Sequence, residues 1–390
     1  MKKRAKTEKP IFYDRILAFA IVALIVFGLV MVASASIDYS YRQYHTSFHF
    51  LIRQAVFLCL ALVLSRFILT CPMKKIREMS VFIFLFAVIC LVLVLIPHLG
   101  HSINGSRRWL GIGSLGMQVS EFAKLAVILY LAGYLVRRNE EVRTTFVGFV
   151  KPMCLLGVVA LLLLKEPDFG ATVVIMTTAM SLMLLSGMRL RNFIVLLALV
   201  VIAMSVLAIS APYRVKRLTS FMNPWAHPFD SGYQLTQSLI AFGNGGVFGV
   251  GLGKSVQKLF YLPEAYTDFL YAVLAEELGL IGILITFSLY TTVVLRAFFI
   301  GRRAQIDGEH YSGYVAYGIG LWLGFQFLVN VGVNAGVLPT KGLTLPLMSY
   351  GGSSLLIDCL AIAILFRVDY ETRIRQYGLR AAQPYRVGRS

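Results

Sequence analysis

The sequence predicts an all-α polytopic membrane protein with about ten transmembrane helices. Hydrophobic residues make up 58% of the 390 residues and charged residues only 14%, whereas soluble domains average about 25% charged residues. The mean hydropathy is +0.74. Apolar runs of about 20 residues, the length that crosses a bilayer, recur along the chain and leave no room for a soluble domain of ordinary size.

Ten apolar segments define the predicted helices, and polar or basic residues separate most of them. The boundary between the fifth and sixth segments is weak, because only residues 165–170 interrupt them. A basic stretch precedes the first segment and no convincing cleavage site follows it, so we expect a retained helix rather than a removed signal. The segments are centred on residues 16–34, 50–69, 81–96, 122–136, 151–164, 171–186, 193–210, 269–299, 314–335 and 346–367.

We expect three parts: a basic N-terminal tail (1–15), a single membrane domain (16–367) and a basic C-terminal tail (368–390). Residues 211–267 form a large extracytoplasmic loop between the seventh and eighth helices. Lysine and arginine residues divide roughly 25 to 10 between the two sides, and the richer side is cytoplasmic by the positive-inside rule. Both tails are then cytoplasmic. The net charge of +18 fits anionic lipid, and no nucleic-acid partner is predicted, because no basic run lies in a soluble domain.

The large loop has two recognisable stretches. Residues 234–242 are amphipathic and predict a half-helix lying in the membrane interface. Residues 243–253 are too rich in glycine to be helical and predict a loop that permits close backbone approach. These glycines do not indicate dinucleotide binding, because no βαβ unit surrounds them. The five cysteines form no CxxC motif and are predicted to be free thiols.

Asp268 lies where this loop turns into the eighth helix, which also carries Glu276 and Glu277. Carboxylates at this depth are unfavourable in lipid, so each requires a partner, a water-filled cavity or a chemical role. One interpretation is that Thr267 or Asp268 caps the helix N-terminus. The other is that Asp268 is the general base of an enzyme that works at the membrane surface.

Further charged residues are predicted to lie in the same outer half of the bilayer. Glu121 and Lys124 share a helix face, either as an intrahelical ion pair or as lining of a cavity that opens outward. Asp168 follows Pro167 in a helix break, where turn chemistry alone explains a Pro-Asp pair. We expect a shared polar cavity suited to proton transfer and phosphate binding. Its members are Arg53, Glu121, Lys124, Asp168, Asp268 and Lys341.

The chain resembles the SEDS family (shape, elongation, division and sporulation) of membrane peptidoglycan glycosyltransferases. Two motifs, Gly-Tyr-Gln-Leu-Thr-Gln-Ser (232–238) and Pro-Thr-Lys-Gly-Leu-Thr-Leu-Pro (339–346), resemble its cell-division branch more than its elongation branch. Three departures are Met117-Gln118-Val119, where Gln-Pro is common before Ser-Glu, Tyr266, where histidine is common, and Glu166, where glutamine is common. The resemblance rests on segments 106–113, 120–124, 165–170, 223–226, 231–238, 263–269, 275–279 and 339–354.

This resemblance implies a ten-helix fold that polymerises lipid II outside the bacterial cytoplasmic membrane during septal wall synthesis, with Asp268 as the catalytic base. It implies that a polyprenyl diphosphate leaves, and it leaves room for a divalent cation, Mg²⁺ or Mn²⁺. The implied partners are a class B penicillin-binding protein transpeptidase and other division proteins of the membrane. The implied cavity and outer-loop residues are Arg53, Trp109, Glu121, Lys124, Asp168 and Lys341, and basic residues that would hold the diphosphate are Arg107, Arg108, Lys124, Arg214, Lys216 and Lys341.

Two other functions fit the same features. A transporter that flips a lipid-linked precursor would also have about ten helices with charges inside the membrane, although we find no clear internal repeat. A scaffold that recruits division proteins would need no chemistry. The substitution Asp268→Asn distinguishes the three functions. It should abolish polymerisation by an enzyme, impair lipid movement by a transporter, and leave cell division intact if the protein is a scaffold.

Overall fold

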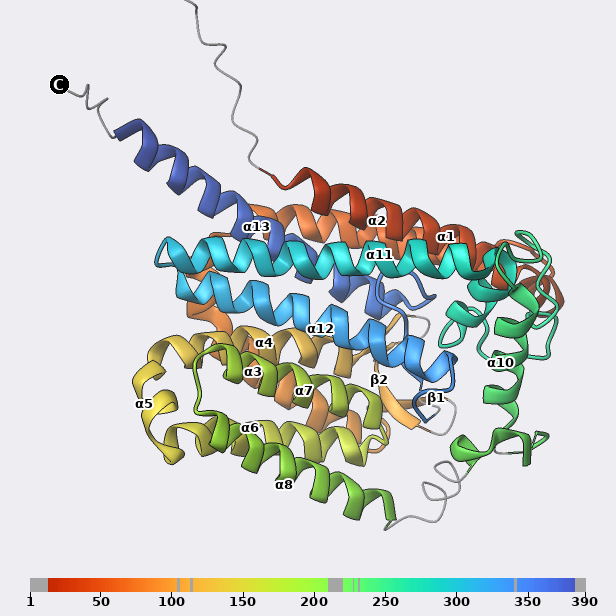
Figure 1. The fold of residues 1–390 in the computed structure, drawn as a ribbon, viewed down its shortest axis with the longest axis horizontal. Helices are drawn as coiled ribbons and strands as arrows, with labels where there is room; N and C mark the ends of the chain where they lie inside the picture. The colour runs from red at the N-terminus through yellow and green to blue at the C-terminus, as the bar shows by residue number, and fades with distance from the viewer. Residues whose placement is uncertain are drawn as a thin grey trace, which may run out of the picture.

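Long helices lying side by side form most of the molecule (Figure 1). The structure, a computed structural model, describes residues 13–103, 106–112, 115–209, 220–226, 228–230, 232–339 and 342–382. The longer helices are α1 (Arg15–Tyr44), α2 (His49–Thr70), α3 (Met73–Leu95), α4 (Val119–Arg137), α6 (Phe146–Lys165), α7 (Phe169–Leu185), α8 (Leu190–Ile209), α11 (Leu270–Ile306), α12 (His310–Asn334) and α13 (Gly352–Ala382). Shorter elements are α5 (Asn139–Thr144), the 3₁₀ turn η1 (Pro224–Ala226) and α10 (Tyr233–Gly245).

Seven of the described helices are long and apolar enough to cross a membrane: α1, α2, α3, α4, α6, α11 and α12. The protein is therefore a polytopic α-helical membrane protein, as its composition predicts. Helices α7, α8 and α13 occupy the three other predicted segments, and a count of ten crossings stays a prediction. Helix α13 continues to Ala382, past the predicted end of the membrane domain at residue 367.

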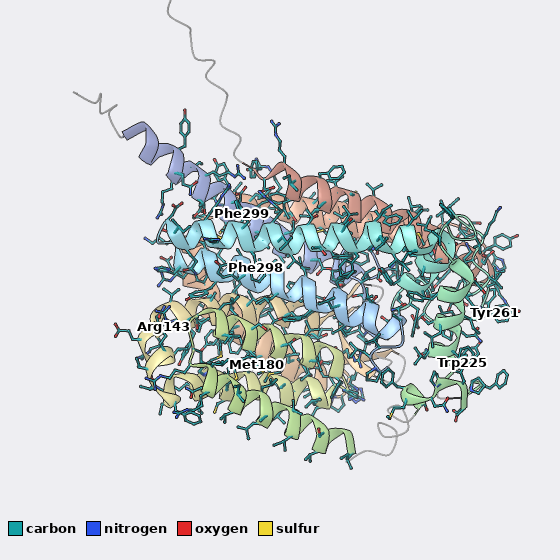
Figure 2. The ribbon with its side chains drawn as sticks, in the orientation of Figure 1. Arg143, Met180, Trp225, Tyr261, Phe298 and Phe299 are labelled. Carbon is teal, nitrogen blue, oxygen red and sulfur yellow. The ribbon has the colours of Figure 1, made fainter. Side chains whose placement is uncertain are left out.

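A small antiparallel sheet lies at one end of the helix bundle, where the sequence suggested only a loop. Its strands are β1 (Gly100–Ile103), β2 (Ser106–Ile112) and β3 (Leu115–Gln118), in the order β1-β2-β3. In Figure 1 this end, which we call the sheet end, also holds α10, whereas α5 lies at the opposite end, the α5 end. Figure 2 shows Trp225 and Tyr261 at the sheet end and Arg143 at the α5 end.

The predicted half-helix of the large loop is present as α10, which extends to Gly245 and so includes the first residues of the stretch predicted to be a loop. Gly245 lies so close to α11 that an added Cβ would stand 1.9 Å from the carbonyl oxygen of Ala275. Helix α11 itself breaks at Gly279, where φ is +63°. Glycine adopts this conformation without the steric penalty that other residues meet.

The prediction that the last helix begins near residue 346 is wrong, because α13 begins at Gly352. Residues 342–351 are irregular, and Leu347 has a positive φ of 66°. Side chains and backbone groups of distant elements bind this stretch and replace the hydrogen bonds of a helix. We call residues 342–354 the central segment, because it lies among α2, β3, α7, α11 and α12.

Candidate active site

The central segment joins the elements that carry the predicted site residues. The Gln54 side chain of α2 donates to the carbonyl oxygen of Ser349 over 3.0 Å, and the Ser349 hydroxyl donates to that of Thr267 over 2.5 Å. The Ser353 hydroxyl accepts from the backbone N–H of Gln118, at the end of β3, over 3.0 Å. These bonds place the residues before α11 against the sheet end of the bundle.

Asp268 does not cap the helix that follows it. The N-cap of α11 is Phe269, and the backbone N–H of Ala272 in the first turn donates to Oδ1 of Asn334 over 3.1 Å. The Nδ2 groups of Asn330 and Asn334 both donate to the Asp268 carbonyl oxygen, over 2.9 and 3.0 Å. The capping interpretation is therefore wrong, and two amides of α12 hold the Asp268 backbone.

The Asp268 carboxylate is partly buried beside Gly342 of the central segment. Burial raises the pKa of Asp268 to about 7; repulsion from Glu264 and Asp168 adds to this shift, and attraction to Arg108 opposes it. A carboxylate with a pKa near neutrality accepts a proton more readily than an ordinary one, and a fraction of it is ionised at pH 7.

Asp168 has the structural role that turn chemistry predicts. Its Oδ1 accepts from the backbone N–H of Ala171 over 3.2 Å and so caps α7. Arg108 of β2 lies 3.8 Å from the same oxygen and donates to the carbonyl oxygens of Glu166 and Pro167 over 3.2 and 2.6 Å. Arg108 thus fastens the sheet to the turn between α6 and α7, where Asp168 and Asp268 influence each other.

Glu166 is a fully buried carboxyl group in this turn. In the described part of the chain neither of its carboxyl oxygens has a hydrogen-bond partner. Burial and the nearby Asp168 raise the pKa of Glu166 to about 8, although attraction to Arg108 lowers it. Glu166 is therefore mostly neutral at pH 7 and adds little charge to the site.

Glu121 and Lys124 form the ion pair of the first interpretation, at 2.8 Å between Oε2 and Nζ. Both are buried, with 4% and 1% of their surface exposed, so the prediction that they line a cavity open to the outside is wrong. Lys124 also donates to Oε1 of Gln326 over 2.6 Å, and Trp322 lies beside it. A cavity of about 10 Å³ adjoins Lys124, among mostly apolar side chains.

The other predicted residues are distributed around the sheet end. Trp109 is in β2, paired with Gln118 of β3, and Arg107 is exposed. Arg108 is the extra residue of a β-bulge in β2, because Ser102 of β1 pairs with Arg107 and His101 pairs with Trp109. Arg53 of α2 is half-buried near Tyr350. Arg214, Lys216 and Lys341 lie outside the described residues.

The family model FTSW_RODA_SPOVE, described as a cell cycle protein, matches residues 15–374. The chain belongs to this family. Two FtsW/RodA/SpoVE relatives share the name "Probable peptidoglycan glycosyltransferase FtsW". The relative from Legionella pneumophila is 53% identical, and the match covers 97% of each chain. The relative from Coxiella burnetii is 55% identical, and the match covers 92% of this chain and 97% of the relative. These names agree with the predicted cell-division branch.

Two solved structures of the family are similar to this fold. A chain from "Structural coordination of polymerization and crosslinking by a peptidoglycan synthase complex" has a TM-score of 0.76 at 27% identity, covering 92% of this chain and 98% of its own. The rod shape determining protein RodA of Thermus thermophilus has a TM-score of 0.68 at 27% identity, covering 92% and 96%. The match confirms the fold over nearly the whole chain.

Sequence reasoning missed several polar residues in this FtsW/RodA/SpoVE fold. Gln326, Asn330 and Asn334 form a ladder of buried amides on one face of α12, and Asp358 of α13 accepts from the backbone N–H of Leu347 over 3.2 Å. The spacing of four residues between amides in an apolar helix was a signal that could have found the ladder. The resemblance leaves room for a divalent cation but assigns no metal ligands. In the described ranges, no group of three or more His, Cys, Asp or Glu side chains could hold a metal ion.

Proposed function

We propose that this protein is a peptidoglycan glycosyltransferase that polymerises lipid II at the outer face of the cytoplasmic membrane during septal wall synthesis. The names of its relatives support the reaction and the septal role. The observation that carries the site assignment is the state of the Asp268 carboxylate. Asn334 binds the first turn of α11, so the carboxylate does not act as a cap, and burial raises its pKa to about 7.

In the proposed reaction the 4-hydroxyl of the acceptor N-acetylglucosamine attacks the anomeric carbon of the donor N-acetylmuramic acid. Asp268 takes the hydroxyl proton as the new C–O bond forms. The bond to the diphosphate oxygen breaks, and the electron pair leaves with the polyprenyl diphosphate. Protonated Asp268 then returns its proton to water.

The diphosphate requires positive charge where its own negative charge develops. Arg107 is the exposed cation of β2, whereas Arg108 is engaged with the turn between α6 and α7. We therefore assign Arg107 to the leaving group and Arg108 to holding the site together. Lys341, Arg214 and Lys216 are further candidates for the diphosphate from the sequence.

A class B penicillin-binding protein is the proposed partner, because one similar structure is of a complex that coordinates polymerisation with crosslinking. A polymerase that works at the outer surface supplies strands to a transpeptidase on the same side. Both tails would then be cytoplasmic and the sheet end would face outward.

The test is glycan polymerisation by purified protein with lipid II and its transpeptidase partner, comparing wild type with Asp268→Asn. Polymer from wild type and none from a folded, partner-binding variant is the expected result. Polymer from both would exclude Asp268 as the base and direct attention to Asp168 and Glu121. If neither makes polymer in a preparation that translocates lipid II, the transporter is favoured.

A further inference from the structure

Two adjacent carboxylates in α11, Glu276 and Glu277, take no part in the site described above. They are 1% and 0% exposed and lie just before the break at Gly279. Buried carboxylates persist only where donors or cations satisfy them. Their partners therefore show what these two residues hold in place.

Glu276 binds the segment that follows α10. Its carboxylate accepts from the Ser255 hydroxyl and, over 3.2 and 3.4 Å, from the backbone N–H groups of Gln257 and Val256. Asn244 of α10 donates to it over 3.3 Å. Hydrogen bonds to a charged acceptor are stronger than neutral ones, so one carboxylate fixes the Ser255 side chain and the backbone of residues 256 and 257.

Glu277 binds the next residue and a third element. Its Oε1 lies 2.8 Å from Nζ of Lys258, in an ion pair whose side chains are 0% and 4% exposed. The Ser34 hydroxyl of α1 donates to the same carboxylate over 2.7 Å and accepts from Lys258 over 3.0 Å. Lys258 is thus a structural cation rather than a free basic residue of the outer loop.

The backbone completes this arrangement at the break in α11. The N–H groups of Val250 and Gly251 each donate over 3.0 Å to the carbonyl oxygens of Glu276 and Glu277. In return, the N–H groups of Leu280 and Ile281 donate to the carbonyl oxygens of Gly246 and Val247 over 3.0 and 3.2 Å. We call residues 244–258 together with 276–281 the interlock.

Asp268 lies between the two halves of the interlock. The chain leaves it at Lys258 and re-enters it at Glu276, so the intervening residues are held at both ends. Within this span, the backbone N–H of Leu262 donates to the Gln257 carbonyl oxygen over 2.8 Å, and that of Phe269 to the Glu264 carbonyl oxygen over 3.1 Å. Hydrogen bonds within residues 257–269 therefore connect Asp268 to the ends of this span, and a shift at either end would move Asp268.

We propose that Glu276 and Glu277 are positioning residues that set the place of Asp268 through the interlock. This inference rests on the proposed function, in which the Asp268 carboxylate must meet an acceptor hydroxyl. A displacement of about 1 Å in a catalytic group lowers a rate by up to roughly a hundredfold while leaving much of the substrate binding intact.

The test compares Glu276→Gln and Glu277→Gln with Asp14→Asn as a matched control. Asp14 is also a buried, ion-paired carboxylate, bound to Arg296 near the other end of α11 and far along the chain from Asp268. Four quantities are measured: kcat, KM for lipid II, the pH dependence of the rate, and hydrogen exchange of residues 254–270. Ser34→Ala removes one donor and keeps the ion pair, and replaces Glu277→Gln if that variant does not fold.

We expect the two glutamine variants to lose at least about tenfold in kcat with little change in KM, to show a shifted pH midpoint, and to exchange faster in residues 254–270. Asp14→Asn should lower the melting temperature and leave these readings unchanged. Glutamine variants that behave like the control would overturn the proposal. If wild type makes no polymer, the proposed function fails, and hydrogen exchange alone still decides whether these carboxylates hold the span that carries Asp268.

Discussion

Gly342 lies against the carboxylate of Asp268, so closely that a Cβ added at residue 342 would stand 2.6 Å from Oδ2. Real Cβ atoms do not come this close to another heavy atom, so one of the two residues would have to move. The absence of a side chain at residue 342 therefore leaves the space that the Asp268 carboxylate occupies.

Gly342→Ala should displace the Asp268 carboxylate and lower kcat for glycan polymerisation by about ten- to a hundredfold. Gly243→Ala is the control, because an added Cβ at residue 243 meets nothing within 4 Å. Kinetics of both purified variants with lipid II would check this. Equal rates for the two variants would mean that the carboxylate position is not critical.

The polymerisation rate should rise with pH and level off above about pH 7. The pKa of Asp268 is raised to about 7 by burial, so the base is protonated and inactive below that pH. A raised pKa also means that the folded protein binds the Asp268 proton more tightly than the unfolded chain does. The contribution of Asp268 to stability is therefore lost as pH rises from the ordinary value, 3.8, towards 7, and Asp268→Asn should melt above wild type at pH 8. A rate that is flat between pH 5.5 and 8.5 would contradict this prediction.

Glu166→Gln should stabilise the protein increasingly as pH rises. Burial raises the Glu166 pKa from 4.5 to about 8, so ionisation is less favourable in the folded than in the unfolded chain. The unfavourable contribution of Glu166 to the free energy of folding is therefore absent below about pH 4.5 and reaches on the order of 3 kcal/mol at pH 7. Thermal unfolding in detergent at pH 5 and pH 8 would check this, and a difference that does not depend on pH would disprove it.

Asn330→Ala should both destabilise the protein and slow catalysis. Asn330 is 2% exposed and donates to two carbonyl oxygens, those of Asp268 and Leu343. In the variant, Asn334 still donates to the Asp268 carbonyl oxygen, but the Leu343 carbonyl oxygen loses the donor from Asn330. A buried acceptor left unsatisfied lowers the stability by about 1 to 3 kcal/mol. Ser288→Ala is the control, since Ser288 is exposed and its hydroxyl bonds a carbonyl of its own helix. Equal melting temperatures for the two variants would argue against this role.

Cysteine labelling in intact cells tests the proposed orientation. Tyr261 and Tyr377 are 51% and 56% exposed, and in Figure 2 Tyr261 lies at the sheet end. In a background without the five native cysteines, a membrane-impermeant maleimide should label Tyr261→Cys directly and Tyr377→Cys only after permeabilisation. If Tyr377→Cys is labelled directly and Tyr261→Cys only after permeabilisation, the protein has the opposite orientation in the membrane.

Much of the fold was readable from local patterns. Apolar length identified the helical segments, and polar spacing located α10 within the large loop. The pair Glu121–Lys124 and the Asp168 cap depend on residues three positions apart, so sequence separation alone brought them together. The same local reasoning placed Asp268 at the boundary between loop and helix, where it lies.

Contacts between distant residues decided the rest. Local patterns left open whether Asp268 caps α11, because the side chain that performs this task, Asn334, comes from the following helix. They also suggested a helix from residue 346, where bonds from Gln54 of α2 and Tyr290 of α11 stabilise an irregular backbone instead. The amino-acid sequence by itself determined which segments enter the membrane, since burial of apolar length in lipid requires no partner. Only the tertiary structure decided which polar groups satisfy one another, because in a low-dielectric interior each donor binds the acceptor that packing places beside it.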